Sequence, residues 1–182
     1  MFMSKAIVFS GLICSGKTTL ADHYCAQYQW DKISFGSYIK NIAEKRQVSL
    51  SRHNLQQIGY EIFKNTDPHD FLRQVINFNK PVSHIHIYDS IRHLDILSEV
   101  REYYEDTVVF YLNVDENIIY KRYIDKYNVD ISYSEFKKII EHPIEKGIVQ
   151  MIDFSDYILD SSKATVEVID EVDVILEKHG FL

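Results

Sequence analysis

The chain has 182 residues, of which 46% are apolar and 26% charged, and its formal net charge is −7. This length supplies one substantial hydrophobic core and is short for two, so we predict a single domain over residues 1–182. The negative charge opposes an extended nucleic-acid surface, because such binding needs Lys and Arg to neutralise phosphates. No apolar run approaches the roughly 20 residues that cross a bilayer, so no membrane association is expected.

The chain contains two cysteines, Cys14 and Cys25. Two cysteines are too few for a disulfide framework, and a reducing, cytoplasmic location is therefore expected. Nothing in the composition distinguishes a monomer from a homodimer.

Short β-rich apolar runs alternate with longer helical patterns along the chain. This alternation predicts βαβ units and a doubly wound, three-layer α/β fold around a five-stranded parallel sheet. The expected strands are Ala6–Ser10, Lys32–Phe35, His84–Asp89, Val108–Val114 and Tyr157–Asp160. The expected helices are Lys17–Tyr28, Tyr38–Lys45, Arg52–Lys64, His69–Phe78, His93–Tyr104, Glu116–Tyr127 and Thr165–His179. Ser51 is a plausible N-cap for the third helix.

Residues 127–153, between the fourth and fifth strands, are polar and follow a helical pattern in part. They are more numerous than a plain crossover connection requires. We therefore predict that this segment forms a mobile lid.

Residues 11–18 read GLICSGKT and match the pattern G-x-x-x-x-G-K-[ST] between the first strand and the first helix. Glycines at these positions let successive backbone N–H groups point at phosphate oxygens, and the following helix adds its positive N-terminal end. The motif predicts a loop that binds a nucleoside triphosphate, and its residues include Gly11, Cys14, Ser15, Gly16, Lys17, Thr18 and Thr19.

Each polar side chain of this loop has an expected task. Lys17 is expected to reach the β- and γ-phosphates, where it follows the charge that moves during transfer, and the Thr18 hydroxyl is expected to hold Mg²⁺. The predicted cofactors are therefore ATP and Mg²⁺. Cys14 occupies a variable position of the loop, and its side chain has no assigned role.

Two further segments follow the second and third strands. Residues 34–40 read SFGSYIK, and residues 85–92 read IHIYDSIR, which places Asp89 and Arg92 at the carboxyl end of a parallel strand. With the loop, these segments resemble, in the right order, the nucleoside monophosphate kinase group, which includes adenylate kinase, deoxynucleotide kinases and dephospho-coenzyme A kinases. The resemblance extends from Ala6 to Leu176.

The resemblance implies an acceptor site built by helices at about 36–80. Lys40 stands where the group usually has an arginine that meets the acceptor phosphate, and it supplies charge without a bidentate fork. Gly36 opens the helix of that segment, and Phe35 and Tyr38 lie where an acceptor base would stack. Arg73, like Arg52, flanks this region as either a phosphate ligand or a surface charge.

The resemblance also assigns the reacting centre. Asp89 would order the Mg²⁺ shell or the attacking phosphate, and Arg92 would bridge the two substrates. Arg122 and Lys126 share a helix face that meets the phosphates from the lid. Lys163 lies in residues 161–164, which resemble the loop that flanks the adenine.

The lid carries few arginines. No arginine follows Arg122 in the chain, whereas many adenylate kinases have several there. Lys137, Lys138 and Lys146 would act as substitutes or as solvated surface charges.

His84 and His86 alternate along a strand and superficially suggest a metal pair. No further Cys or His ligands accompany them, so we predict packed or partly exposed histidines.

These features predict an ATP- and Mg²⁺-dependent phosphotransferase whose acceptor is a nucleoside or deoxynucleoside monophosphate. One alternative keeps the chemistry but phosphorylates a hydroxyl, as in dephospho-coenzyme A kinase, with Asp89 as general base. Another alternative is an ATP-binding sensor or interaction module without small-molecule kinase activity.

Overall fold

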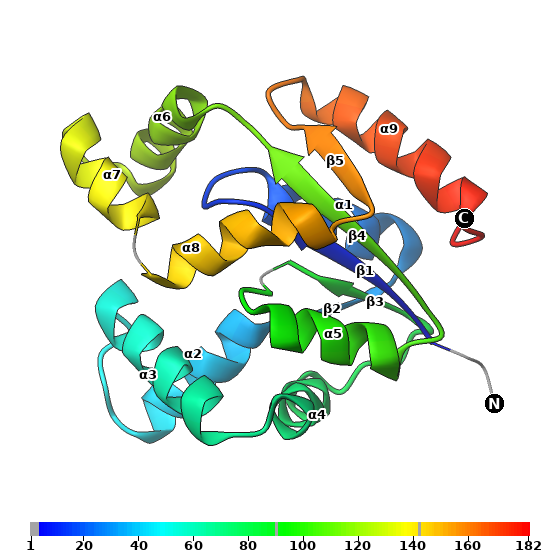
Figure 1. Ribbon diagram of the computed structural model, residues 1–182, viewed down its shortest axis with the longest axis horizontal. Helices are drawn as coiled ribbons and strands as arrows, with labels where there is room; N and C mark the ends of the chain where they lie inside the picture. Colours follow the sequence, from blue (N-terminus) through cyan, green and yellow to red (C-terminus); the bar gives the residue numbers. More distant parts are fainter. Residues whose placement is uncertain (1–3, 90, 142) are drawn as a thin grey trace.

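A five-stranded parallel sheet forms the centre of the computed structural model, which describes residues 4–89, 91–141 and 143–182. The side chains of residues 52 and 143–146 lie outside the description as well. The strands are β1 (Lys5–Ser10), β2 (Asp31–Ile33), β3 (Ile85–Tyr88), β4 (Asp106–Asn113) and β5 (Tyr157–Asp160), in the order β2-β3-β1-β4-β5. Every neighbouring pair is parallel, which confirms the predicted doubly wound fold (Figure 1).

The central strand β1 is buried on both faces. Ala6, Ile7, Val8 and Phe9 are each 0% exposed, as expected for a parallel strand covered by helices on each side. Ala6 and Val8 join one hydrophobic cluster and Ile7 and Phe9 join another, because successive side chains of a strand point to opposite faces. The sheet therefore separates two cores.

Helices cover both faces of the sheet (Figure 1). The core that contains Ile7 and Phe9 is closed by α1 (Lys17–Tyr28) and α9 (Thr165–Lys178). The other core is closed by α2 (Phe35–Lys45), α3 (Arg52–Asn65), α4 (Pro68–Asn79), α5 (Leu94–Tyr103), α8 (Pro143–Gln150) and the 3₁₀ helix η1 (Met151–Phe154). A third, smaller cluster joins α6 (Glu116–Tyr127) and α7 (Tyr133–Ile140) to the loop after β1.

The predicted elements are present, with shifted boundaries at several ends. The largest shift lies after β2, where Lys32–Phe35 was expected to continue as strand. Ser34 instead caps α2, because its side chain accepts a hydrogen bond from the Ser37 N–H, and Phe35 is already helical. The predicted cap at Ser51 is confirmed, since its hydroxyl accepts from the N–H of Asn54.

The segment predicted as a lid, residues 127–153, contains α7, α8 and most of η1, with residue 142 outside the described part. Its two halves have different surroundings. Phe136 and Ile140 of α7 belong to the small third cluster. Ile148 of α8 and Met151 of η1 are buried in the main core, at 3% and 0% exposure. Within the described residues, no helix is both long enough and apolar enough to span a membrane.

Candidate functional site

The loop between β1 and α1 has the backbone that its two glycines allow. Gly11 has φ of +134° and Gly16 has φ of +103°, in the left-handed region that favours glycine. A Cβ at Gly11 would lie 2.6 Å from the carbonyl oxygen of Leu112, and a Cβ at Gly16 would lie 3.2 Å from Ser161 Oγ. The loop is therefore packed tightly against β4 and the segment after β5.

Lys17 is the first residue of α1, and its side chain points back into the loop. Its Nζ donates to the carbonyl oxygens of Gly11 and Leu12, at 2.7 and 2.6 Å. Thr18 and Thr19 are exposed in the same helical turn, whereas Ser15 is fully buried behind it. The amino end of α1 and the Lys17 ammonium thus place positive charge at one point, which suits a polyphosphate.

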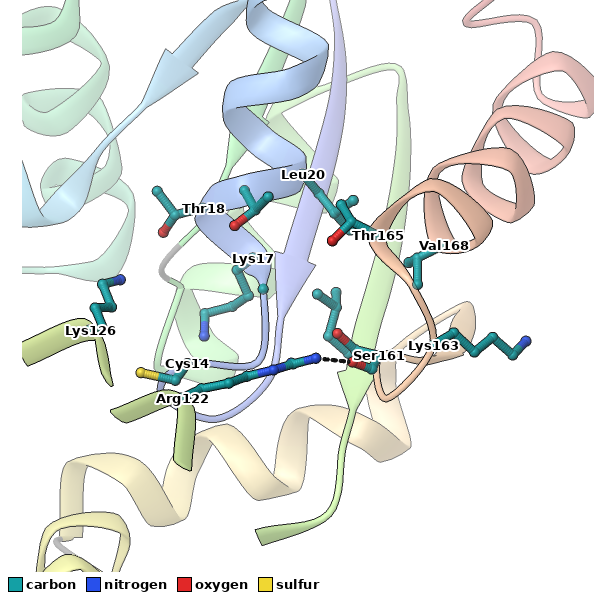
Figure 2. Close-up of a pocket in the computed structure, with 13 residues that line it drawn as sticks. Cys14, Lys17, Thr18, Leu20, Arg122, Lys126, Ser161, Lys163, Thr165 and Val168 are labelled. Carbon is teal, nitrogen blue, oxygen red and sulfur yellow. Dashed lines mark hydrogen bonds between the residues drawn. The ribbon is translucent and has the colours of Figure 1, made fainter. Parts of the chain in front are cut away.

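A cavity of about 270 Å³ opens on one side of the loop. Helix α6 and the segment after β5 complete its wall, which includes Lys17, Arg122 and Lys163 (Figure 2). Arg122 Nη2 donates to the carbonyl oxygen of Ser161 at 2.8 Å, so the guanidinium is held across the cavity (Figure 2). All the residues predicted to bind the donor nucleotide line this cavity except Gly11, which lines the other side of the loop, and Ser15, which is buried.

A larger cavity of about 650 Å³ opens on the other side of the loop, within the range of small-molecule sites. Five of the residues predicted for the acceptor and the reacting centre line it, namely Phe35, Gly36, Lys40, Asp89 and Arg92. Tyr38 does not, because its ring packs against Phe71 and Phe78, and Arg122 lines the smaller cavity instead. Arg73 is exposed on α4 and lines neither cavity, while the side chain of Arg52 lies outside the described residues.

Aromatic side chains that sequence reasoning missed form much of this larger cavity. Phe63 of α3 stacks on His93 with ring centroids 3.6 Å apart and an interplanar angle of 8°. Tyr60 and Tyr123 face the same space from α3 and α6. Burial, followed by the charge of Arg92, lowers the pKa of His93, so its ring is neutral at physiological pH. Tyr60 and Phe63 share α3, but no spacing in the sequence connects them with His93 or with Tyr123 of α6.

Asp89 is buried at 9% exposure at the carboxyl end of β3, and its charge is felt by Lys32 of β2. Burial alone would lower the pKa of Lys32. The hydrogen bond to Asp22 and the charges of Asp89 and Asp22 outweigh burial and raise that pKa. Lys32 therefore stays cationic beside the Asp89 carboxylate.

The two cavities meet at the phosphate loop. Four residues line both of them, namely Cys14, Lys17, Thr18 and Lys126. The resemblance placed Lys126 on a helix face that it shares with Arg122 and that meets the phosphates. The structure brings this lysine to the junction, opposite the loop, where an anion passing between the cavities would lie.

The oxygen atoms around the junction suit Mg²⁺. Thr18 contributes a hydroxyl and Asp89 a carboxylate, and Mg²⁺ is commonly held by one or two such groups together with substrate phosphates and water. In the described part of the chain, no group of three or more His, Cys, Asp or Glu side chains is arranged to hold a metal. The ion would therefore arrive with the triphosphate, and it would neutralise phosphate charge there.

Of the two histidines expected to alternate along a strand, His86 lies in β3 and His84 precedes it. His86 Nδ1 lies 2.6 Å from the hydroxyl of Tyr104, and Nε2 lies 3.1 Å from the carbonyl oxygen of Ser83. The Tyr104 hydroxyl also bonds that of Tyr88 at 2.8 Å. His86 is thus a buried structural histidine, as predicted, while His84 is exposed before β3.

No protein-family model matches the chain, and no curated protein matches its sequence. Solved structures do match over nearly the whole length. The shikimate kinase of Aquifex aeolicus VF5 superposes with a TM-score of 0.58 at 12% identity, covering 96% of this chain and 98% of that one. The gluconokinase of Sinorhizobium meliloti 1021 has a TM-score of 0.55 at 13% identity, with 99% and 97% covered. A sugar kinase of Janibacter sp. HTCC2649 has a TM-score of 0.54 at 14% identity, with 96% and 95% covered.

At such low identities this similarity defines the fold alone. The chain has the P-loop fold of these small-molecule kinases, as the loop after β1 and the strand order indicate. The fold agrees with the resemblance found in the sequence, but it does not distinguish nucleoside monophosphate kinases from the kinases that act on other small molecules.

Proposed function

We propose that the protein transfers the γ-phosphoryl group of Mg²⁺-ATP to the phosphate of a nucleoside or deoxynucleoside monophosphate. One observation carries this proposal. Lys17, Thr18, Cys14 and Lys126 line both cavities, so a donor in the smaller cavity and an acceptor in the larger one would approach each other at the residues best suited to phosphate.

The walls of the larger cavity favour a nucleotide over a polyhydroxylated acid. A sugar acid requires a hydrogen-bonding partner for each hydroxyl that it buries. The part of the wall formed by Phe35, Phe63, Phe71 and Ile96 offers none and suits a planar base, while Gln56, Tyr60 and Tyr123 of the same cavity can hydrogen-bond the polar edge of that base. Lys40 and Arg92 add positive charge to the same cavity, as an acceptor phosphate requires.

The proposed reaction is a direct in-line displacement. An oxygen of the acceptor phosphate forms a bond to the γ-phosphorus while the bond from that phosphorus to the β-bridging oxygen breaks, and ADP leaves with the electron pair. The acceptor oxygen is already anionic at neutral pH, so no general base is needed. Lys17, Arg92 and Lys126 neutralise charge between the two phosphates, which is the main task of the protein in such transfers.

The direct test is an incubation of the purified protein with ATP, Mg²⁺ and a panel of ribo- and deoxynucleoside monophosphates, with products separated by chromatography. We expect a nucleoside diphosphate from at least one member, and no product with the Lys40→Met/Arg92→Met variant. A panel in which no member yields a diphosphate, although ATP binds, would reject the proposal.

A second candidate is transfer to a hydroxyl group, and the position of Asp89 favours it. This carboxylate lines the larger cavity at the end of β3, where it would remove a hydroxyl proton as general base. Dephospho-coenzyme A, shikimate and gluconate added to the panel separate the two candidates. With a hydroxyl acceptor, Asp89→Asn is expected to remove turnover while ATP binding persists. With a phosphate acceptor, some turnover should survive, because no proton has to be taken.

A further inference from the structure

Helix α8 lies in unusually close contact with the backbone beside the proposed acceptor site. A Cβ built on Gly147 would lie 2.7 Å from the carbonyl oxygen of Arg92, closer than real side chains approach a backbone atom. Figure 1 shows α8 running from the α7 end of the molecule across the same face as α5. Only a glycine at position 147 allows this approach.

The helix is held where it is by its next turn. Ile148 and Met151 are 3% and 0% exposed and pack in the same buried cluster as Ile91. Moving α8 outward would open a cavity under these side chains, which is costly in a closely packed core. Residues 91–93 have no regular secondary structure, so their backbone is displaced more easily than α8 when the two are pushed apart.

We propose that Gly147 is a positioning residue for Arg92. Because Gly147 has no side chain, α8 packs directly against the Arg92 backbone and fixes the position of that backbone beside the acceptor cavity. The inference rests on the proposed function, since it matters for turnover only if Arg92 contacts the acceptor. Sequence patterns did not suggest it, because residues 92 and 147 are joined by no motif.

The test uses Gly147→Ala in the full-length protein. In an unobstructed helix, alanine stabilises relative to glycine by roughly 1 kcal/mol. The contact with Arg92 predicts the opposite sign, a lower melting temperature. It also predicts an acceptor kcat/KM reduced by about tenfold or more with the KM for ATP unchanged, because small displacements at a reacting centre are costly. Val149→Ala, at an exposed site of the same helix, is the matched control: it should leave the acceptor kcat/KM unchanged and should not lower the melting temperature.

Two additional measurements keep the inference open to refutation. In the double variant Gly147→Ala/Ile148→Val, the smaller side chain at position 148 anchors α8 less firmly in the core. The helix can then shift away from Arg92, so the double variant should recover part of the acceptor kcat/KM that the single variant loses. In ¹⁵N NMR, the Nε–Hε signal of Arg92, assigned with Arg92→Lys, should move in Gly147→Ala and stay in Val149→Ala.

These outcomes distinguish a failure of the positioning role of Gly147 from a failure of the proposed function. An unmoved Arg92 signal, or a Gly147→Ala protein with a raised melting temperature and full acceptor kcat/KM, would overturn the positioning role. If the unmodified protein phosphorylates no acceptor, the proposed function fails, and the Arg92 signal still decides whether α8 positions this residue.

Discussion

Lys17 is the residue on which we expect donor binding and turnover both to depend. It is the cation at the amino end of α1, and it lines both cavities. We expect Lys17→Met to lower kcat by about 10²–10³-fold, since removing one preorganised charge from a reacting centre has effects of this size. Steady-state kinetics measures the change in kcat, and calorimetry measures the binding of ATP. Lys178→Met, at the exposed end of α9, serves as control. Equal turnover in both variants would remove Lys17 from the reaction.

His86 makes the stability of the fold depend on pH. Burial lowers its pKa below the ordinary value of 6.5, so the unfolded chain binds a proton that the folded chain excludes. The stability contributed by neutral His86 is fully present above pH 6.5 and is lost as the pH falls toward the folded pKa. His93 shifts in the same direction, because burial and then Arg92 lower its pKa.

The prediction is therefore a decrease in the free energy of unfolding between pH 7.5 and 5, measured by urea denaturation. His86→Gln should be less stable at pH 7.5 and show a shallower decrease, with the remaining slope due in part to His93. An unchanged slope would mean that folding does not lower the pKa of His86.

At the scale of elements, α6 and α7 form a unit with a small core of its own. Phe136 is fully buried in this cluster, which also contacts Leu12 and Ile13 of the phosphate loop. Phe136→Ala should lower the opening free energy of this unit by about 3–5 kcal/mol, the usual effect of such a truncation. We expect faster hydrogen exchange in α6 and α7 and a higher KM for ATP. Phe78→Ala, at an exposed site on α4, is the control. Uniform loss of protection across the sheet would instead show that the unit does not open separately.

The elements also show which parts of the structure could be predicted from the sequence. The strand, loop and helix around GLICSGKT are local patterns, so their fold and role were predictable from residues adjacent in the chain. The position of Ser34 as a cap was readable in principle but competed with the apolar residue after it. In residues 127–153, periodicity indicated helices, but it could not show that Ile148 and Met151 are buried in the main core.

Contacts between distant segments account for the rest of the site. The stack of Phe63 on His93 and the approach of Gly147 to Arg92 join residues that share no motif, so they depend on tertiary packing alone. Lys126 reaches the junction of the cavities only because α6 is placed over the loop. Arg73, in contrast, was close in sequence to the acceptor helices but faces solvent.

At the scale of the whole molecule, the donor should stabilise the folded state. A ligand that binds only the folded chain adds about 2.7 kcal/mol when present at 100 times its Kd. For a domain of this length, that corresponds to a rise in Tm of about 5–10 °C. Mg²⁺-ATP should produce this rise in a thermal denaturation scan. EDTA should reduce it, and Lys17→Met should abolish it. An unshifted Tm at saturating ATP would contradict donor binding by the loop.

The central claim is that the two cavities hold the donor and the acceptor of one reaction. A bisubstrate analogue with two nucleosides joined through five phosphates tests it most directly, by titration calorimetry. We predict one analogue per chain, bound at least 10²-fold more tightly than ATP because its second half binds at a high effective concentration, and competing with both ATP and the acceptor. An analogue that binds no more tightly than ATP and leaves acceptor binding unchanged would contradict the account.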